Sequence, residues 1–400
     1  MTKWLRGVER LAPIAEHAGA SGSPWSAVWT FPAMIGAAFV VAWGAEAAEF
    51  LISQGLALAI LALIQTMPEF AVEAVIAWKA GKNPDMVHLA IANFTGSLRL
   101  LTGFGWPMIY AVAAFSSRQR RGKNLGSIKL HDDHAVEVLG LLPPLLYFIV
   151  VWAKASLGLI DAAVLTATYA AYLTVLLRLP PRADAEEQSE EIPAVSRWAL
   201  SFAGWKRWAA VLGLFVVGGA IIFVVAEPFL SSMMSLAVSL GITQFVFIQW
   251  VAPFISEFPE KTSAFAWARR ITRAPVALVN MVSSNINQWG VLSGLLAVIY
   301  CWSHGDTSPL PFDEFQRLEI LLTILQAFLG WLFLASMSFE AAEAVGLFTL
   351  WVIQFAVPSL RHEMLYVYGA WIVLEVGLLA AGKKKLLAFQ AFARRYKGRV

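Results

Sequence analysis

Long apolar runs separated by short polar segments dominate the hydrophobic pattern of this chain. A helix that crosses a bilayer needs about 20 mostly apolar residues, and several runs exceed that length, which allows tilt or a break. Eleven runs qualify as candidate spans, namely residues 27–47, 51–78, 87–115, 135–153, 157–178, 207–226, 236–267, 274–302, 316–337, 341–359 and 364–382. The pattern therefore predicts an all-α polytopic membrane protein.

Composition excludes the soluble alternative. Apolar residues make up 58% of the 400 residues and charged residues 14%, whereas soluble domains have roughly 25% charged residues. So few charges do not cover the surface of a soluble protein of this size. The net charge of +3 is too small to indicate nucleic acid as a partner, and we expect the lipid bilayer instead. No motif of a metalloprotease, serine hydrolase or P-loop occurs, so we expect neither an enzyme nor a cofactor.

Charges in the connecting segments set the expected orientation. Segments 118–129, 269–273 and 383–399 are rich in Lys and Arg, while the charged residues of 306–314 are all acidic. The positive-inside bias places the three basic segments, and with them the C-terminus, on the cytoplasmic side, which we expect to be that of the cell (inner) membrane. The same reasoning puts the N-terminus outside, although Lys3, Arg6 and Arg10 oppose that placement.

Two segments, one in each half of the chain, repeat an unusual order of features. The first has Gln-Thr-Met-Pro-Glu at 65–69, a basic hairpin, and Ala-Asn-Phe-Thr-Gly-Ser at 92–97. The second has Ser-Glu-Phe-Pro-Glu at 256–260, a basic hairpin, and Val-Asn-Met-Val-Ser-Ser-Asn at 279–285. Each half contains an odd number of spans, so the second half starts on the opposite side of the membrane from the first. The two copies therefore have opposite orientations. Inverted repeats with broken helices are typical of the binding site of secondary transporters.

The Pro-Glu pair in each copy points to cation chemistry. Proline removes a backbone donor and opens the helix. The glutamate that follows it is a carboxylate at membrane depth, where it costs about 2.5–3.5 kcal/mol on insertion scales. Two such glutamates, Glu69 and Glu260, would balance a divalent cation, and hydroxyl, amide and carbonyl oxygens would complete the shell of a hard ion.

At these motifs the chain resembles the cation/calcium exchanger superfamily, whose two α-repeats have a Thr-Ser-Leu-Pro-Glu-like element followed by a Gly-Asn-x-x-Gly-Ser-Asn-like element. The resemblance implies a ten-helix core of two inverted five-helix repeats, with ions bound where the α-repeats meet. It also implies that Glu69 and Glu260 are the principal ion carboxylates. The positions that usually lend further oxygens correspond to Thr66, Ser97, Ser256 and Ser284.

The resemblance sets the expected domain organisation, in which one helix is added to the ten-helix core. The predicted order is a polar N-terminal segment (1–25), a first exchanger repeat of five helices (26–179), an acidic cytoplasmic linker (180–205), a second repeat of five helices (206–360), an additional helix (361–382) and a basic cytoplasmic tail (383–400).

The sequence departs from the family pattern at two positions. A ligand-type Asn or Asp often stands four residues after the motif serine, where this chain has Leu101 and Gln288. Gln288 remains a candidate ligand. Because both motif glutamates are present, we expect transport to be retained. The alternative is a transport-inactive, exchanger-like membrane sensor or accessory protein.

Further polar residues near the motifs have two readings each. Glu73 lies one turn from Glu69, where like charges repel unless an ion or a proton is shared, and the other reading is a residue in the outer interface. Glu257 is a candidate ligand, or the partner of Lys261 four residues later. Asn285, like Asn93 and Asn280, either ligates the ion or cross-links helices. The favoured function is an antiporter that exchanges a cation, Ca²⁺ as the first expectation, against H⁺ or Na⁺, with H⁺ slightly preferred.

Overall fold

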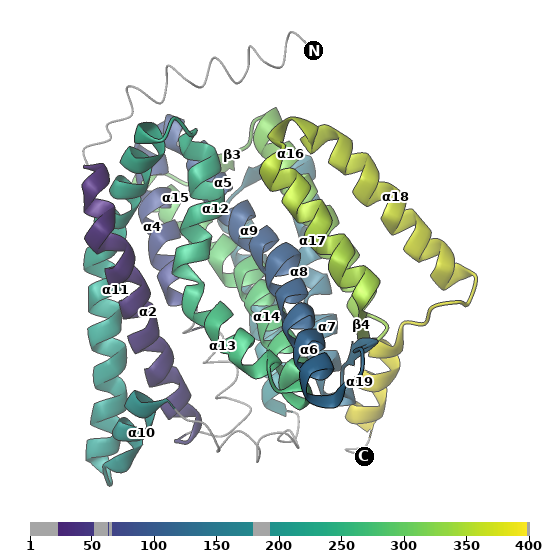
Figure 1. Cartoon of the computed structure of the whole chain (residues 1–400). Coiled ribbons are helices and arrows are strands. Elements are labelled where there is room, and N and C mark those ends of the chain that lie inside the picture. Colours follow the sequence, from purple (N-terminus) through teal and green to yellow (C-terminus); the bar gives the residue numbers. More distant parts are fainter. Residues whose placement is uncertain (1–22, 52–62, 64–65, 179–192, 398–400) are drawn as a thin grey trace.

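The structure, a computed structural model, describes residues 23–51, 63, 66–178 and 193–397. Three predicted features therefore lie wholly or largely outside the described residues: the N-terminal segment before residue 23, most of the first half of the second span, and the acidic linker up to residue 192. Long helices run roughly side by side and form one bundle (Figure 1), as the hydrophobic pattern predicts.

The first half of the chain supplies one set of helices: α2 (Ala27–Glu49), α4 (Met67–Lys82), α5 (Val87–Leu100), α6 (Trp106–Arg121), α7 (Ala135–Gly140), α8 (Leu142–Lys154) and α9 (Leu159–Arg178). The second half supplies α11 (Trp205–Ser239), α12 (Gln244–Ser256), α13 (Phe258–Ala268), α14 (Ala274–Asn287), α15 (Ser293–His304), α16 (Glu314–Leu334) and α17 (Ala341–Ala356). Short 3₁₀ turns precede several of them: η1 (Pro24–Ser26), η2 (Pro84–Met86), η4 (Asp132–His134) and η6 (Ile271–Arg273).

Prolines mark where several of these helices begin. Pro68, Pro107, Pro259 and Pro275 are each the second residue of a helix, in α4, α6, α13 and α14 respectively. Proline is tolerated in the first turn because the backbone N–H it lacks has no partner inside the helix there. Pro68 and Pro259 are equivalent in the two halves, at the Pro-Glu motif. Pro107 and Pro275 are not equivalent, because Pro107 begins the helix after η3 (Leu101–Gly105) and Pro275 begins the helix before η7 (Gln288–Leu292).

Seven helical stretches in the described part of the chain are long and apolar enough to cross a bilayer, and α12 and α17 are shorter apolar helices. One predicted boundary is wrong. The sixth span was expected to end at residue 226, before Glu227, but α11 continues to Ser239 with both Glu227 and Pro228 inside it. Glu227 lies at the surface and pairs with Lys79 of α4 at 3.1 Å, so its charge does not end the helix. The next span accordingly begins at Gln244 instead of residue 236.

Two short strand pairs join the halves. Strand β1 (Ser127–Lys129), after α6, pairs antiparallel with β4 (Ser338–Glu340), which precedes α17. Strand β2 (Ser156–Leu157), after α8, pairs antiparallel with β3 (Leu310–Pro311), which follows α15. In each pair a strand of one half joins the strand that is not its counterpart in the other half, which is the arrangement that two inverted repeats produce.

Aromatic side chains fill the centre of the bundle beside the repeat motifs. Phe94 of α5, Phe148 of α8 and Trp289 are all buried, and their ring centroids lie 4.5–5.9 Å apart. Aromatic pairs at such separations add to the stabilisation that their burial provides. They hold the second motif helix of each half against the other, so the polar residues of those helices are brought into a packed core.

Beyond the second half, η8 (Pro358–Leu360) leads into α18 (Arg361–Ala380), which packs on α16, and α19 (Leu387–Lys397) packs near α7. Lys384 joins this extension to the core, since its ammonium lies 2.9 Å from Glu343 of α17 and 2.7 Å from Glu375 of α18. Burial lowers the pKa of Lys384, but hydrogen bonds to Glu375 and Glu343 outweigh burial and raise the pKa overall. The helix α10 (Ala194–Ser201) lies within the predicted linker.

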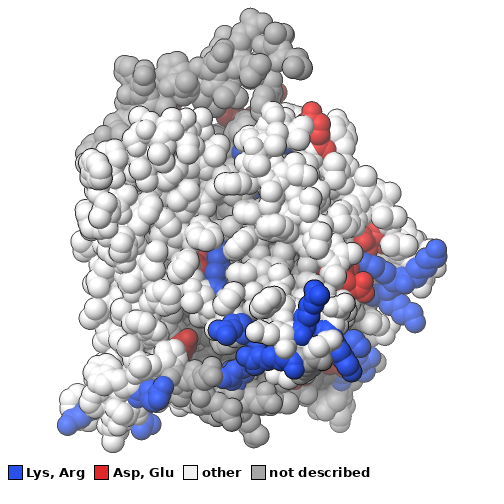
Figure 2. Space-filling model, in the orientation of Figure 1, with Lys and Arg blue, Asp and Glu red and all other residues white. Residues whose placement is uncertain are grey.

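Most Lys and Arg side chains on the face drawn in Figure 2 gather at one end of the bundle, where α6, α13 and α19 lie in Figure 1. Arg120 and Arg269, from the basic segments 118–129 and 269–273, line the same cavity, and Arg394 of the tail pairs with Asp132 at 2.9 Å. The three segments used to predict the orientation are therefore at the same end.

Candidate ion-binding site

The two Pro-Glu motifs have the same local structure. Thr66 precedes α4, and Glu257 stands between α12 and α13 with φ −95° and ψ 9°, outside the helical range. Proline follows at the second helical position, so Glu69 and Glu260 each become the third residue of a helix. The N-terminal turn of a helix favours a nearby negative charge, because the free N–H groups of that turn point outward and the positive end of the helix dipole lies there. The sequence order Pro-Glu thus places a carboxylate in the first turn of a new helix in both halves.

Glu69 belongs to a buried cluster with Glu73 and Asn93 of the neighbouring helix α5. The Asn93 amide nitrogen donates to Glu69 at 2.7 Å and to Glu73 at 2.6 Å. Ser256, from the other half of the chain, donates its hydroxyl hydrogen bond to the second oxygen of Glu69. All four side chains are buried. One amide therefore holds two carboxylates that would otherwise repel each other, and the structure brings Glu69 together with Glu73 and Ser256 as expected.

Glu257 is held by three donors. One of its oxygens accepts from the Ser97 hydroxyl of α5 and, at 2.8 Å, from the Gln288 amide nitrogen. The other oxygen is paired with the Lys261 ammonium one turn later on α13. The Glu257–Lys261 pair, one of the two readings the sequence allowed, is thus formed, and the remaining oxygen is engaged by residues that were candidate ligands.

Glu260 has a different environment. It is 2% exposed, yet no residue in the described part of the chain donates a hydrogen bond to either of its carboxylate oxygens. The Ser284 hydroxyl, also buried, is the polar group beside the Glu260 carboxylate, although its geometry falls short of a regular hydrogen bond. Buried polar groups normally have partners, so a carboxylate and a hydroxyl left open side by side are suited to an ion.

Thr66 and Asn285 occupy the edges of this cluster. Thr66 donates to the Leu63 carbonyl at 2.9 Å and accepts from the amide of Asn287, a residue that the sequence reasoning did not single out. Asn285 accepts from Thr102 at 3.5 Å and donates to the Leu98 carbonyl at 3.4 Å. These contacts cross-link the second motif helices of the two halves, which is one of the two roles expected for Asn285.

Both second motif helices contain a short π-helix, η3 (Leu101–Gly105) and η7 (Gln288–Leu292). Each π-helix begins at one of the two positions where the chain departs from the family pattern. The wider turn re-aims the side chains that follow it, and such bulges are frequent at functional sites. Leu101 is apolar and buried, whereas Gln288 points its amide at Glu257, so the two halves differ here.

Close helix packing at the cluster depends on one glycine. A β-carbon on Gly96 would lie 1.8 Å from the backbone oxygen of Gln249 in α12. No L side chain fits in that space, and the glycine therefore permits α5 and α12 to touch. This contact is what brings Ser97 of α5 within reach of Glu257.

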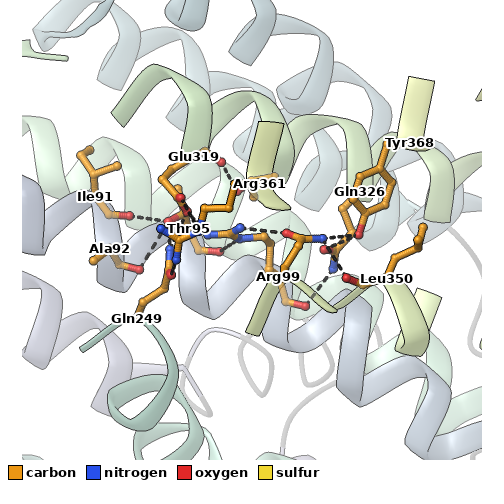
Figure 3. Close-up of polar contacts among 12 residues, drawn as sticks. Ile91, Ala92, Thr95, Arg99, Gln249, Glu319, Gln326, Leu350, Arg361 and Tyr368 are labelled. Carbon is orange, nitrogen blue, oxygen red and sulfur yellow. Dashed lines mark hydrogen bonds and ion pairs between the residues drawn. The ribbon is translucent and has the colours of Figure 1, made fainter. Parts of the chain in front are cut away.

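A second buried polar network lies beside the ion cluster (Figure 3). The ion cluster is the set of Glu69, Glu73, Glu257 and Glu260 with the side chains that contact them. At the centre of the second network, the carboxylate of Glu319 on α16 pairs with Arg99 of α5 and, at 3.0 Å, with Arg361 of α18. Gln249 donates to Glu319 at 2.7 Å and accepts from Arg361 at 3.0 Å. The network continues through Gln354, Tyr368 and Gln326, which form hydrogen bonds with one another or with Arg99.

The sequence reasoning missed this network. The signal that was available in the sequence was a charge inside an apolar run, as at Arg99 and Glu319. Two guanidinium groups meet one carboxylate, so one positive charge is left over beside the ion cluster.

No group of three or more His, Cys, Asp or Glu side chains among the described residues is arranged to hold a metal ion. Glu69 and Glu73 come from one half of the chain and Glu257 and Glu260 from the other, and Glu69 and Glu257 lie close enough for their charges to interact.

The chain matches the sodium/calcium exchanger protein family over residues 22–178 and 210–359. It belongs to this family. The two matched segments cover both halves that contain the motifs, so the predicted resemblance is confirmed, as is the all-α fold of two inverted five-helix repeats with a further helix. The exchanger is an integral membrane protein, and α18 and α19 lie beyond its second matched segment.

Solved structures support the same conclusion. A crystal structure of an H⁺/Ca²⁺ exchanger, CAX, is 28% identical with a TM-score of 0.83, over 99% of this chain and 94% of that one. Two structures of the sodium-calcium exchanger NCX_Mj, soaked with Na⁺ and Sr²⁺, are 17% and 16% identical with TM-scores of 0.54 and 0.55, over 83% of this chain and 97% of theirs. The latter likeness concerns the fold. A comparison with curated proteins gives no match.

Proposed function

We propose that the protein is a secondary-active antiporter that exchanges Ca²⁺ against H⁺ or Na⁺ by alternating access, with Glu69 and Glu260 as the central ion-binding carboxylates. The observation that supports it most is the pair of matched carboxylates. Each begins a helix after a proline, each is buried, and they come from opposite halves of an inverted repeat. Neither carboxylate oxygen of Glu260 accepts a hydrogen bond of regular geometry from the described residues, and only the Ser284 hydroxyl lies beside it, which leaves it available to a cation.

The formal charges around these carboxylates fit a divalent cation. Four ionised glutamates and one lysine leave three negative charges in the ion cluster, and the adjoining network of Arg99, Glu319 and Arg361 adds one positive charge. One Ca²⁺, or two protons or sodium ions, would therefore neutralise the buried core. Glu69 and Glu73 already share a single amide donor, which favours a proton shared between them as the counter-ion. The likeness to the H⁺/Ca²⁺ exchanger at 28% identity favours the same choice.

The proposed transport is tested by Ca²⁺ uptake into proteoliposomes under a pH gradient without Na⁺, and separately under a Na⁺ gradient at equal pH. We expect uptake under the pH gradient, and its loss in Glu69→Gln and in Glu260→Gln. Glu375→Gln is the matched control, because it also neutralises a buried carboxylate but lies on α18, where Trp371 and Lys384 contact it. Equal uptake by all three variants and the native protein would refute the assignment of the two carboxylates.

The transport-inactive alternative has two observations in its favour: Lys261 neutralises Glu257, and Leu101 offers no oxygen to an ion. The two functions differ in the uptake assay, since an inactive sensor binds Ca²⁺ without moving it under either gradient. In both cases we propose that the protein performs no chemical reaction, and that the basic end with the C-terminus faces the cytoplasm.

A further inference from the structure

A lysine side chain lies inside the ion cluster. The Lys261 side chain is 5% exposed and that of its partner Glu257 is 1% exposed. A charge at membrane depth is costly and is normally found facing another charge or a water-filled pathway. Lys261 is also the residue directly after Glu260, so its ammonium lies among carboxylates that we propose bind the transported ion.

The Glu257 carboxylate, with which the Lys261 ammonium is paired, has neighbours whose oxygens suit a monovalent metal ion. Ser97 and Gln288 contact the carboxylate oxygen that Lys261 does not. Glu257 offers a carboxylate, Ser97 a hydroxyl, and Gln288 an amide whose oxygen has no hydrogen-bond donor among the described residues. A hydroxyl can accept as well as donate, and an amide can turn its oxygen toward a cation. Carboxylate, hydroxyl and amide oxygens are the ligands of hard cations.

A comparison of the two repeats shows that Glu257 and Lys261 are both present in the second repeat and both absent from the first. At the positions of Glu257 and Lys261, the first repeat has Thr66 and Phe70, which are both neutral. At these positions the second repeat therefore has an additional carboxylate, and it also has an additional ammonium whose charge neutralises that carboxylate. A buried ion pair gives little net stability compared with apolar residues of similar size, so stability alone gives no reason for the pair at this place.

We propose that Lys261 is a resident cation: its ammonium, paired with Glu257, takes the place of a monovalent metal ion that Glu257, Ser97 and Gln288 would otherwise bind. The site at Glu69 and Glu260 then remains for the exchanged ion, and no second metal ion binds beside it. This inference rests on the proposed function for the identity of the neighbouring site, but the vacant site it predicts can be measured without transport.

The test uses thermal unfolding of the purified full-length protein in NaCl, with choline chloride replacing NaCl at constant ionic strength. Lys261→Met removes the ammonium and leaves Glu257 in place. We expect Na⁺ to stabilise this variant, and at a concentration about one hundred times its Kd the ratio of folded to unfolded protein should rise about 100-fold. The native protein and Lys261→Arg should show at most the smaller shift in Tm that Na⁺ at Glu69 and Glu260 would produce.

The double variant Glu257→Gln with Lys261→Met is the matched control, because it removes the carboxylate as well as the ammonium. It should respond to Na⁺ no more than the native protein does. A response of Lys261→Met no larger than that of the native protein, or an equal response of the double variant, would overturn the proposal.

If Lys261→Met unfolds on extraction in choline chloride, NaCl during extraction should recover it, and loss in both salts would equally overturn the proposal. Ca²⁺ uptake by the native protein tests the proposed function separately, so absent transport with a Na⁺ response in Lys261→Met would contradict only the proposed function.

Discussion

Arg99 on α5 and Glu319 on α16 form an ion pair in which neither side chain is exposed. Arg99 lies two residues after Ser97, which contacts Glu257, and Glu319 also pairs with Arg361 at the start of α18. The pair therefore fixes the rotation of α5 about its axis. It connects the ion cluster to the helix that lies outside the ten-helix core.

Glu319→Gln should strongly destabilise the protein. The change leaves two buried guanidinium groups without a carboxylate, and breaking a buried pair by removing one partner costs about 3–5 kcal/mol. Thermal unfolding in detergent measures the loss. Glu227→Gln is the control, since the Glu227–Lys79 pair is largely exposed and such a pair contributes about 0–1 kcal/mol. Similar losses in the two variants would show that burial of the first pair has no energetic consequence.

Gly96→Ala should prevent the contact between α5 and α12. Its new methyl group would overlap a backbone oxygen, which cannot move away as a side chain can, and overpacking of this kind costs about 1–3 kcal/mol or more. We expect a lower Tm and lower Ca²⁺ uptake per folded molecule, because Ser97 and Glu257 separate. Gly219→Ala in α11 has open space around it and should be neutral or stabilising, as expected for alanine in a helix.

Asn93→Leu should impair Ca²⁺ exchange more than it impairs folding. Leucine has a similar size but donates no hydrogen bond, so Glu69 and Glu73 lose their shared donor. An unsatisfied buried polar group costs about 1–3 kcal/mol, which corresponds to roughly 5- to 150-fold in an equilibrium constant. Ca²⁺-dependent stabilisation measures the change in affinity. Asn93→Gln, which retains an amide, should recover part of it; no difference between the two variants would contradict a role for the hydrogen bonds.

Ca²⁺ binding should weaken as the pH falls. The carboxylates must be ionised to bind the cation, so protons compete with it and are released when it binds. The Ca²⁺-dependent shift in Tm, measured from pH 5 to pH 8, should therefore increase with pH. Glu73→Gln removes one competing carboxylate and should make the dependence less steep. An unchanged slope would show that Glu73 exchanges no proton when Ca²⁺ binds.

The proposed orientation can be measured with single cysteines. Cys301 is buried and should react slowly with a charged maleimide, which leaves a low background. Lys123→Cys, at the basic end, should be labelled only after the inner membrane is permeabilised. Asp306→Cys lies in the acidic segment at the opposite end and should be labelled from outside in intact cells. The reverse pattern would invert the topology.

Local sequence was sufficient for part of this site. The Pro-Glu motifs predict two carboxylates in equivalent turns, and the spacing of four residues between Glu257 and Lys261 predicts a pair on one helix face. Both follow from the geometry of a single helix, which the chain encodes over a few residues.

The remaining contacts depend on which helices pack together. Arg99 and Glu319 are 220 residues apart, and Asn287 reaches Thr66 from the other half of the chain. Hydrophobic periodicity does not specify such partners, because it shows which face of a helix is apolar but not which other helix that face packs against. The end of α11 was mispredicted for a related reason: Glu227 reaches a lysine of another helix, and a charge inside a run was taken as its boundary.

The strand pairs β1–β4 and β2–β3 have a mechanical consequence. They connect loops of one half to loops of the other by backbone hydrogen bonds at two places. The two halves therefore cannot rotate relative to each other as rigid bodies without breaking those hydrogen bonds. Helices α2 and α11 lie side by side at one edge of the bundle (Figure 1), and neither adjoins a loop that these strand pairs connect. A transport cycle exposes the carboxylates first to one side of the membrane and then to the other. We therefore expect such a cycle to move α2 and α11 relative to the helices that the strand pairs connect.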